Sequence, residues 1–187
     1  SSRITVIGIT GTNGKTTTTH IIRSIIEAAG ERAGLIGTIS YDAGSGEMPA
    51  PNTTPESLVL QRLLDEAARA GMKYTAGEVS SHALDQGRAN DVHFAVGVFT
   101  NLSGEHLDYH KDMPSYARAK GILFRRLSPE ATAVVNADDA YTETIVRGTP
   151  ARTVVRYGFG ASADVRVSDL RTDVTGSRFK LTTPQGE

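Results

Sequence analysis

Apolar residues in the first part of the chain recur with two different periods. An apolar, β-branched run over residues 4–9 predicts a buried strand, and a further strand is predicted over 33–39. Between them a helix is predicted over 16–29, ended by Gly30. Its apolar stripe is made of Ile21, Ile22, Ile25 and Ile26. Residues 41–55 are rich in Gly, Pro, Ser and Asn and predict a long loop.

The rest of the chain continues the alternation of strands and helices. Helices are predicted over 55–71 and 113–127. Strands are predicted over 73–79, 94–99, 131–135 and 153–157. Shorter alternating runs over 164–170 and 177–181 predict an antiparallel hairpin at the edge. The fold class is therefore α/β, with a mostly parallel sheet, helices on both faces and antiparallel edge strands near the C-terminus.

Composition narrows the possible classes of protein. A chain of 187 residues with 39% hydrophobic residues suits one globular domain. The formal net charge of -1 gives no electrostatic reason to expect nucleic acid as a partner. There is no cysteine, which excludes disulfides and thiolate metal sites, and no apolar run is long enough for a membrane span.

A phosphate-binding loop is predicted directly after the first strand, at Gly11-Thr12-Asn13-Gly14-Lys15-Thr16. Glycines let backbone N–H groups close around phosphate oxygens, and the following helix adds its positive N-terminus. Lys15 is expected to reach the terminal phosphates, and the Thr16 hydroxyl to coordinate Mg²⁺. The general pattern has a glycine where this chain has Ile9, so a glycine-rich turn with a chance lysine stays open as the alternative.

Three polar segments follow predicted strands, at residues 78–82, 100–106 and 136–139. In an open parallel sheet, ligands bind beyond the carboxyl ends of the strands, so all three are expected to face the phosphate loop. An acid such as Glu78 beside a triphosphate is a suitable Mg²⁺ ligand, whereas a histidine such as His106 is a poorer one. Each segment also has a purely structural interpretation. Glu78 could cap a helix, Asn136 and Asp138 could form a turn, and His106 and His110 could be packed or exposed.

Several motifs in order resemble the Mur ligase family, over nearly the whole chain. They are the phosphate loop continued to Thr19, Asn52-Thr53-Thr54-Pro55, Glu78-Val79-Ser80-Ser81-His82-Ala83-Leu84 and Asn101-Leu102-Ser103-Gly104-Glu105-His106-Leu107-Asp108-Tyr109-His110. The last three are most similar to the branch that adds the third residue of the peptidoglycan stem peptide. Two positions depart from the family pattern, Gly77 before Glu78 and Gly104-Glu105 before His106.

The resemblance implies a role for each matching residue. Lys15 would hold the β- and γ-phosphates of ATP within the loop Gly11, Thr12, Asn13, Gly14, Lys15, Thr16 and Thr17. Thr16 and Glu78 would ligate one Mg²⁺, and His106 with Lys120 a second. Lys120 matches the family lysine that carbon dioxide carbamylates, although residue chemistry alone favours an ordinary solvated helix lysine there. Asn136 and Asp139 would contact adenosine. The UDP-sugar peptide would be held by Asn52, Thr53, Thr54, Ser80, Gln86 and Arg88.

The function implied is ATP-dependent amide-bond formation through an acyl phosphate. The substrates would be UDP-MurNAc-L-Ala-D-Glu and a diamino acid, diaminopimelate or lysine, and the enzyme is expected to be a cytoplasmic monomer. Residues 1–187 would be a truncated central ATP-binding domain, without the UDP-binding and amino-acid-binding domains and inactive alone. The alternatives are a folylpolyglutamate-synthetase-like or cyanophycin-synthetase-like ligase, or a non-catalytic nucleotide-binding module.

Overall fold

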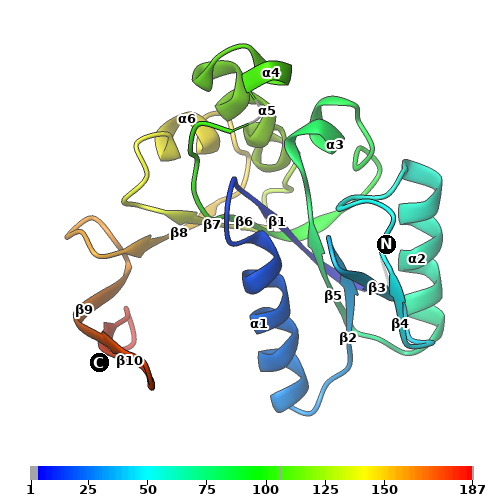
Figure 1. The fold of residues 1–187 in the computed structure, drawn as a ribbon, viewed down its shortest axis with the longest axis horizontal. Helices are drawn as coiled ribbons and strands as arrows, with labels where there is room; N and C mark the ends of the chain where they lie inside the picture. The colour runs from blue at the N-terminus through cyan, green and yellow to red at the C-terminus, as the bar shows by residue number, and fades with distance from the viewer. Residues whose placement is uncertain (1–3, 106, 187) are drawn as a thin grey trace.

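The computed structural model describes residues 4–105 and 107–186. Within these residues ten strands form one sheet in the spatial order β10-β9-β8-β7-β6-β1-β5-β2-β3-β4 (Figure 1). The strands are β1 (Thr5–Thr10), β2 (Ala33–Ile36), β3 (Ser40–Asp42), β4 (Glu47–Pro49), β5 (Tyr74–Glu78), β6 (Phe94–Phe99), β7 (Thr132–Asn136), β8 (Thr153–Gly158), β9 (Val165–Asp173) and β10 (Gly176–Thr182). The helices are α1 (Lys15–Ala28), α2 (Ser57–Arg69), α3 (Ser81–Asp85), α4 (Leu107–His110), α5 (Met113–Arg125) and α6 (Thr142–Val146).

The centre of the sheet is parallel. Strands β2, β5, β1, β6, β7 and β8 pair in parallel, so their carboxyl ends meet at one edge. Antiparallel pairs lie at both ends of the sheet, β9 with β10 at one end and β2, β3 and β4 at the other. The predicted α/β class, parallel sheet and C-terminal hairpin are confirmed. The second antiparallel edge was not predicted.

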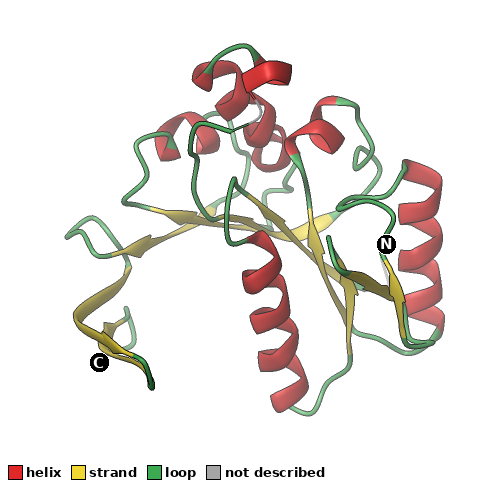
Figure 2. Ribbon diagram, in the orientation of Figure 1, coloured by secondary structure: helices red, strands yellow, loops and turns green. Residues whose placement is uncertain are grey.

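Helices cover both faces of the sheet, as predicted (Figure 2). One face carries the larger core, in which Leu63 of α2, Phe124 of α5 and Ile145 of α6 belong to one buried cluster. The opposite face carries α1, whose Ile22 packs against a cluster formed by Ile9, Ala76 and Val98. Because the strand side chains alternate between the two faces, the central strands β1, β6 and β7 contribute to both clusters.

Two predictions about the first third of the chain were wrong in detail. The predicted loop over 41–55 contains most of the β3–β4 hairpin, which begins at Ser40. The apolar stripe of α1 is only partly turned to the sheet, because Ile21 is 53% exposed and Ile25 is 63% exposed. The short helices α3, α4 and α6 were also not predicted, since five residues or fewer carry too little periodicity to identify a helix.

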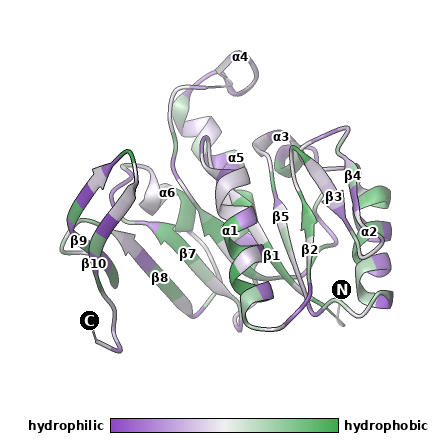
Figure 3. Cartoon of the chain, turned by 60° about the horizontal axis from the view of Figure 1, so that its bottom comes forward, coloured by the Kyte–Doolittle hydropathy of each residue, from purple (hydrophilic) through white to green (hydrophobic). Residues whose placement is uncertain are grey.

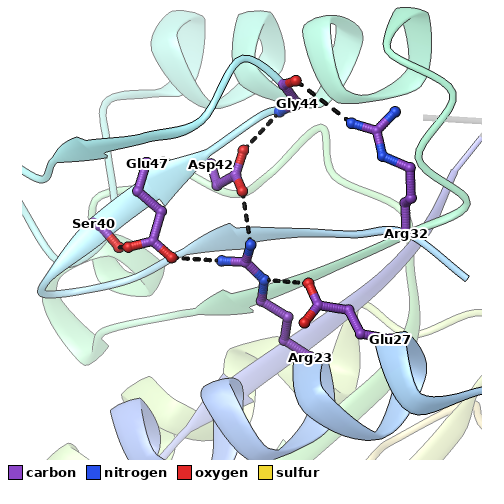
Figure 4. A network of polar contacts seen from close by, with 7 residues as sticks. All are labelled: Arg23, Glu27, Arg32, Ser40, Asp42, Gly44 and Glu47. Carbon is purple, nitrogen blue, oxygen red and sulfur yellow. Dashed lines mark hydrogen bonds and ion pairs between the residues drawn. The ribbon is translucent and has the colours of Figure 1, made fainter.

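One arginine attaches the β3–β4 hairpin to α1 (Figure 4). The Arg23 guanidinium lies 2.8 Å from a carboxylate oxygen of each of Glu27, Asp42 and Glu47. Ser40 donates to Glu47 at 3.1 Å, which closes the network. The chain leaves this hairpin into residues 50–55, and the Tyr41 hydroxyl donates to the Asn52 carbonyl. The network therefore helps to fix the segment in which Asn52, Thr53 and Thr54 lie.

The C-terminal hairpin has little cover. Strand β9 pairs with β8 at only two positions, and residues 169–181 are exposed. Figure 3 shows hydrophobic colours along β7, whereas β9 and β10 carry many hydrophilic residues. Among the described residues, no helix has the length and apolar character that a membrane crossing requires.

Candidate active site

The phosphate loop after β1 is held against the segment that follows β6. Thr12 N–H donates to the Asn101 carbonyl at 2.8 Å, and Asn13 N–H to Asn101 Oδ1 at 3.0 Å. A Cβ on Gly11 would lie 1.9 Å from Thr100 Oγ1, so this close approach requires glycine. Gly14, at φ 81°, begins α1 without a side-chain cap. The first N–H groups of α1 therefore remain available to an anion.

The Lys15 amine curls back over this loop. Its Nζ donates to the carbonyls of Gly11 at 3.0 Å and Thr12 at 2.7 Å. Burial lowers its pKa, and the negative charges of Glu78 and Glu105 oppose that shift. A triphosphate would supply stronger acceptors for this amine than two neutral carbonyls, because charge-assisted hydrogen bonds are the stronger ones.

Glu78, at the end of β5, is a buried carboxylate surrounded by donors. Its Oε1 accepts from Thr16 Oγ1 at 2.9 Å and from Thr38 N–H at 2.9 Å, and its Oε2 accepts from Thr38 Oγ1 at 3.1 Å. Gly37 permits this packing, since a Cβ there would lie 2.6 Å from Oε1. Glu78 and Thr16 thus place two hard oxygen donors side by side beside the phosphate loop.

Two oxygen donors suit Mg²⁺, whereas a metal ion that is bound by protein ligands alone would need more of them. Among the described residues, no three histidine, cysteine or acidic side chains converge on one metal position. Mg²⁺ commonly takes one or two protein oxygens, together with phosphate oxygens and water. His106, which was predicted as a ligand, lies outside the described residues.

A hollow of about 600 Å³ joins the phosphate loop to the predicted substrate side. It is lined by Thr12, Asn13, Gly14, Lys15, Thr16, Thr17, Thr38, Asn52, Thr53, Thr54, Glu78, Ser80, His82, Gln86 and Arg88. The wall opposite the phosphate loop therefore consists of three segments, namely the loop after β4, the end of β5 and the end of α3. All six predicted substrate-binding residues lie on this wall.

The substrate-side residues also hold one another. Thr54 Oγ1 donates to the Glu78 carbonyl at 2.9 Å and accepts from Ser80 N–H at 3.0 Å. Ser80 in turn caps α3 by accepting from Ala83 N–H at 3.1 Å. Arg88 donates to the Thr54 carbonyl at 3.2 Å and to Gln86 Oε1 at 2.9 Å. Arg88 also pairs with Glu56 at 3.0 Å, so these contacts preorganise the wall around one guanidinium, the group best suited to bind an anion.

Lys120 is not the solvated helix lysine that residue chemistry alone favoured. It is 1% exposed, and its Nζ donates to the Gly11 carbonyl at 2.7 Å. Burial, followed by the positive charge of Lys15, lowers its pKa to about 6. The solvated interpretation is therefore wrong, and the amine lies beneath the phosphate loop in its neutral form near pH 7.

The third predicted segment bonds mainly to neighbouring loops, the second of the three predicted segments included. Asn136 Nδ2 donates to the Thr100 carbonyl at 2.9 Å, and Asp139 Oδ2 accepts from Leu102 N–H at 2.7 Å. Asp138 accepts from Phe159 N–H at 2.6 Å. Asn136 and Asp139 thus support the loop after β6, and Asp138 supports the loop after β8. The residues that line the hollow include none of 100–105 and none of 136–139. The expectation that all three segments share one crevice was too broad.

Two residues of the hollow had no predicted role. Thr38 follows β2, so the strand-end rule applied to that strand would have found it. His82 stands in a motif, but nothing in its residue type indicated a role beyond packing. Its ring centroid lies 4.0 Å from that of Tyr109.

Comparison with known proteins resolves which family has this arrangement. The family with the description "Mur ligase middle domain" matches this chain over residues 9–187. The chain belongs to the Mur ligase family. The resemblance predicted from the motifs is therefore confirmed.

Named relatives of this Mur ligase chain agree on one branch. It is 45% identical over 188 residues to the UDP-N-acetylmuramoyl-L-alanyl-D-glutamate--2,6-diaminopimelate ligase of Bacillus cereus, covering 97% of this chain and 38% of that protein. It is 46% identical to the ligase of the same name from Geobacter sulfurreducens, covering 98% of this chain and 37% of that one. The chain thus spans well under half the length of these relatives.

Solved structures show the same fold. A UDP-N-acetylmuramoyl-L-alanyl-D-glutamate--2,6-diaminopimelate ligase matches with a TM-score of 0.85 at 35% identity, over 98% of this chain and 38% of that one. An FPGS–AMPPCP complex matches with a TM-score of 0.67 at 17% identity, over 98% of this chain and 52% of that one. At that identity the second likeness concerns the fold alone.

Proposed function

We propose that this Mur ligase chain is the central nucleotide-binding domain of an ATP-dependent ligase. The ligase joins UDP-MurNAc-L-Ala-D-Glu to diaminopimelate, the amino acid in the names of its relatives. The observation that carries the proposal is the single hollow that joins the phosphate loop to the wall bearing Thr54, Ser80 and Arg88. Such a hollow can hold a triphosphate and an anionic second substrate face to face.

The reaction proceeds by activation of a carboxylate. The side-chain carboxylate of the D-glutamate attacks the γ-phosphorus of ATP, and the bond to the β-phosphate oxygen breaks, which gives an acyl phosphate and ADP. The diaminopimelate amine then attacks the acyl carbon, loses a proton and expels phosphate. Because both reactants of the first step are anions, the protein contributes chiefly positioning and charge neutralisation.

The residues that bind the nucleotide and those that bind the UDP-linked peptide lie on two opposite walls of the hollow. Lys15 and the first N–H groups of α1 hold the β- and γ-phosphates, and the donors of Arg88 and the Ser80–Thr54 wall orient the UDP-linked peptide. Thr16 and Glu78 would hold Mg²⁺, which would supply neutralisation of phosphate charge. Asn136 and Asp139 contribute to adenosine binding through the loop that they support.

Lys120 is carbamylated in the working enzyme, as the family resemblance implies. Its amine nitrogen attacks carbon dioxide and releases one proton, which converts a buried base into an anion with two hard oxygens. Burial beneath the phosphate loop supports this step, because only a neutral amine is nucleophilic. Together with His106, which the family resemblance also implies as a ligand, the carbamate would hold a second Mg²⁺. A mass gain of one carbon dioxide on Lys120 tests this assignment.

The proposed substrates also indicate in which cellular compartment the enzyme works. ATP and a UDP-linked precursor are cytoplasmic metabolites, so we propose a cytoplasmic enzyme. We further propose that it acts as a monomer.

Replacing Lys15 tests the proposed function directly. In the full-length protein, Lys15→Ala should lower the rate of amide formation by roughly 10²- to 10³-fold, because one preorganised charged donor is lost. Lys73→Ala is the matched control, since that lysine is exposed and its amine pairs with Glu31 away from the hollow. Product formation from ATP, UDP-MurNAc-L-Ala-D-Glu and diaminopimelate is the measurement. A wild-type protein that binds ATP but forms no product would instead be a non-catalytic binding module.

A further inference from the structure

Two buried aromatic residues beside the site have no part in the function proposed above. His110 ends the motif that contains His106, and it is 6% exposed. Tyr116, in the first part of α5, is 0% exposed. Their rings stack, with centroids 4.9 Å apart and planes inclined by 26°. A buried, stacked pair with polar atoms at its edges is well suited to fixing the distance between the segments that it contacts.

Tyr116 contacts the phosphate side of the site. Its hydroxyl lies 3.3 Å from Thr12 Oγ1, which also accepts from Ser103 N–H at 3.0 Å. The Lys120 amine lies 4.4 Å from the centroid of the Tyr116 ring. One side chain therefore contacts both the phosphate loop and the lysine that donates to Gly11.

His110 contacts the substrate side of the site. Its Nε2 lies 2.9 Å from the hydroxyl of Ser81, the first residue of α3. Ser81 is 2% exposed and follows Ser80, whose N–H donates to Thr54. The hydrogen bond from His110 thus ends one residue from the wall that faces the predicted UDP-linked substrate.

The backbone between the two rings has a constrained conformation. Lys111 has φ 68°, in the left-handed region that non-glycine residues rarely adopt. Asp112 then caps α5 by accepting from Ser115 N–H at 2.7 Å. The energy cost of such a backbone conformation is tolerated where the surrounding contacts fix the geometry. This agrees with a defined placement of the His110 ring on the Tyr116 ring.

We infer that Tyr116 and His110 are positioning residues that set the separation between the phosphate loop and the substrate wall. The inference rests on the proposed function, since the separation matters only if two substrates must meet. Each substrate binds to one wall, so weakening the bridge should leave binding largely intact. It should slow the step in which the carboxylate reaches the γ-phosphorus, because small misplacements of reacting atoms are costly.

Tyr116→Phe in the full-length protein is the first test, because it removes only the hydroxyl. We expect kcat to fall by about 10-fold, with KM for ATP and for UDP-MurNAc-L-Ala-D-Glu changed by less than about 3-fold. The melting temperature should fall by no more than about 4 °C. Tyr74→Phe is the matched control, since it removes a hydroxyl at the first residue of β5, at the end of that strand opposite to Glu78 and outside the hollow, and its kcat should equal that of the wild type.

The pair is then tested with His110→Asn, which takes away the contact of Nε2 with Ser81. This variant should show the same selective loss of kcat. In the double variant with Tyr116→Phe the losses should combine to less than their product, because both remove one bridge. Unchanged kcat in an active enzyme, fully multiplicative losses, or a loss that only follows a lowered melting temperature would overturn the inference. An inactive wild-type enzyme would instead overturn the proposed function.

Discussion

At the scale of single residues, burial changes the chemistry of Lys120 more than any sequence pattern indicates. In the unfolded chain its pKa would be near 10.5, whereas in the folded protein it is about 6. Between these two values the unfolded state binds one more proton than the folded state. Stability must therefore increase with pH across this window, and below pH 6 the penalty for charging the buried amine is fully present.

Comparison with Lys120→Met isolates this effect. Relative to the variant, the wild-type protein should gain up to about 1.4 kcal/mol in unfolding free energy for each pH unit between about pH 6.5 and 9.5. Urea unfolding in carbon-dioxide-free buffer at several pH values is the measurement, since carbamylation would change the charge. Parallel stability curves for the two proteins would show that Lys120 keeps an ordinary pKa.

The same scale shows where residue-level prediction succeeds. The phosphate loop and Glu78 were predictable because each stands at the carboxyl end of a strand, where backbone direction alone decides what the residue faces. Asn136 and Asp139 also stand there, but they bond to the neighbouring loop instead of facing the hollow. Which partner a polar side chain takes depends on the tertiary distance to it, and no sequence spacing gives that distance.

At the scale of elements, the β3–β4 hairpin depends on the charge network around Arg23. Arg23→Met keeps much of the apolar stem but leaves Asp42, whose side chain is 9% exposed, without its cation. We expect a loss of about 1–2 kcal/mol in unfolding free energy. We also expect an increased KM for the UDP-linked substrate, because the protein segment predicted to bind it directly follows the hairpin. Arg62→Met is the control, because that exposed pair with Glu66 should contribute less than about 0.5 kcal/mol. Equal effects of the two variants would contradict this role.

Helix α1 offers a second comparison, between two isoleucines of the predicted apolar stripe. Ile22 packs against the cluster of Ile9, Ala76 and Val98, whereas Ile25 is 63% exposed. Ile22→Lys should cost about 1–2 kcal/mol because apolar contact is lost. Ile25→Lys should change stability by less than about 0.5 kcal/mol. Thermal or urea unfolding of both variants is the measurement, and a larger loss for Ile25→Lys would show that its surface is buried in solution.

Elements were predictable where hydrophobic period and length were both sufficient. Strand β6 and helices α1, α2 and α5 have enough turns or apolar residues for one period to prevail. The β3–β4 hairpin could not be predicted, because its strands are three residues each and lie among glycines and prolines that also indicate a loop. Its pairing is fixed by Arg23 and by Tyr41, which are tertiary contacts.

At the scale of the whole molecule, stability is concentrated in the parallel centre of the sheet. Strands β1, β5 and β6 lie between helices of both faces, and the phosphate loop and Glu78 extend directly from the ends of β1 and β5. The edge that carries the proposed site is therefore attached to the best-buried strands. Alternation over 164–170 and 177–181 predicted the hairpin correctly, and its apolar residues Leu170, Phe179 and Leu181 are exposed.

Hydrogen exchange should reveal this gradient as a difference between strands of the same sheet. Strand β9 is attached to β8 only through the pairs Tyr157–Val165 and Gly158–Arg166, so the hairpin can open without disturbing either core cluster. Its amides should exchange on the order of 10³-fold faster than those of β1 and β6, whose opening requires global unfolding. Exchange followed by mass spectrometry on residues 1–187 measures both regions in one sample. Equal protection would mean that the hairpin unfolds only together with the centre of the sheet, and hence that its two-residue attachment to β8 is not the weak point that its exposure indicates.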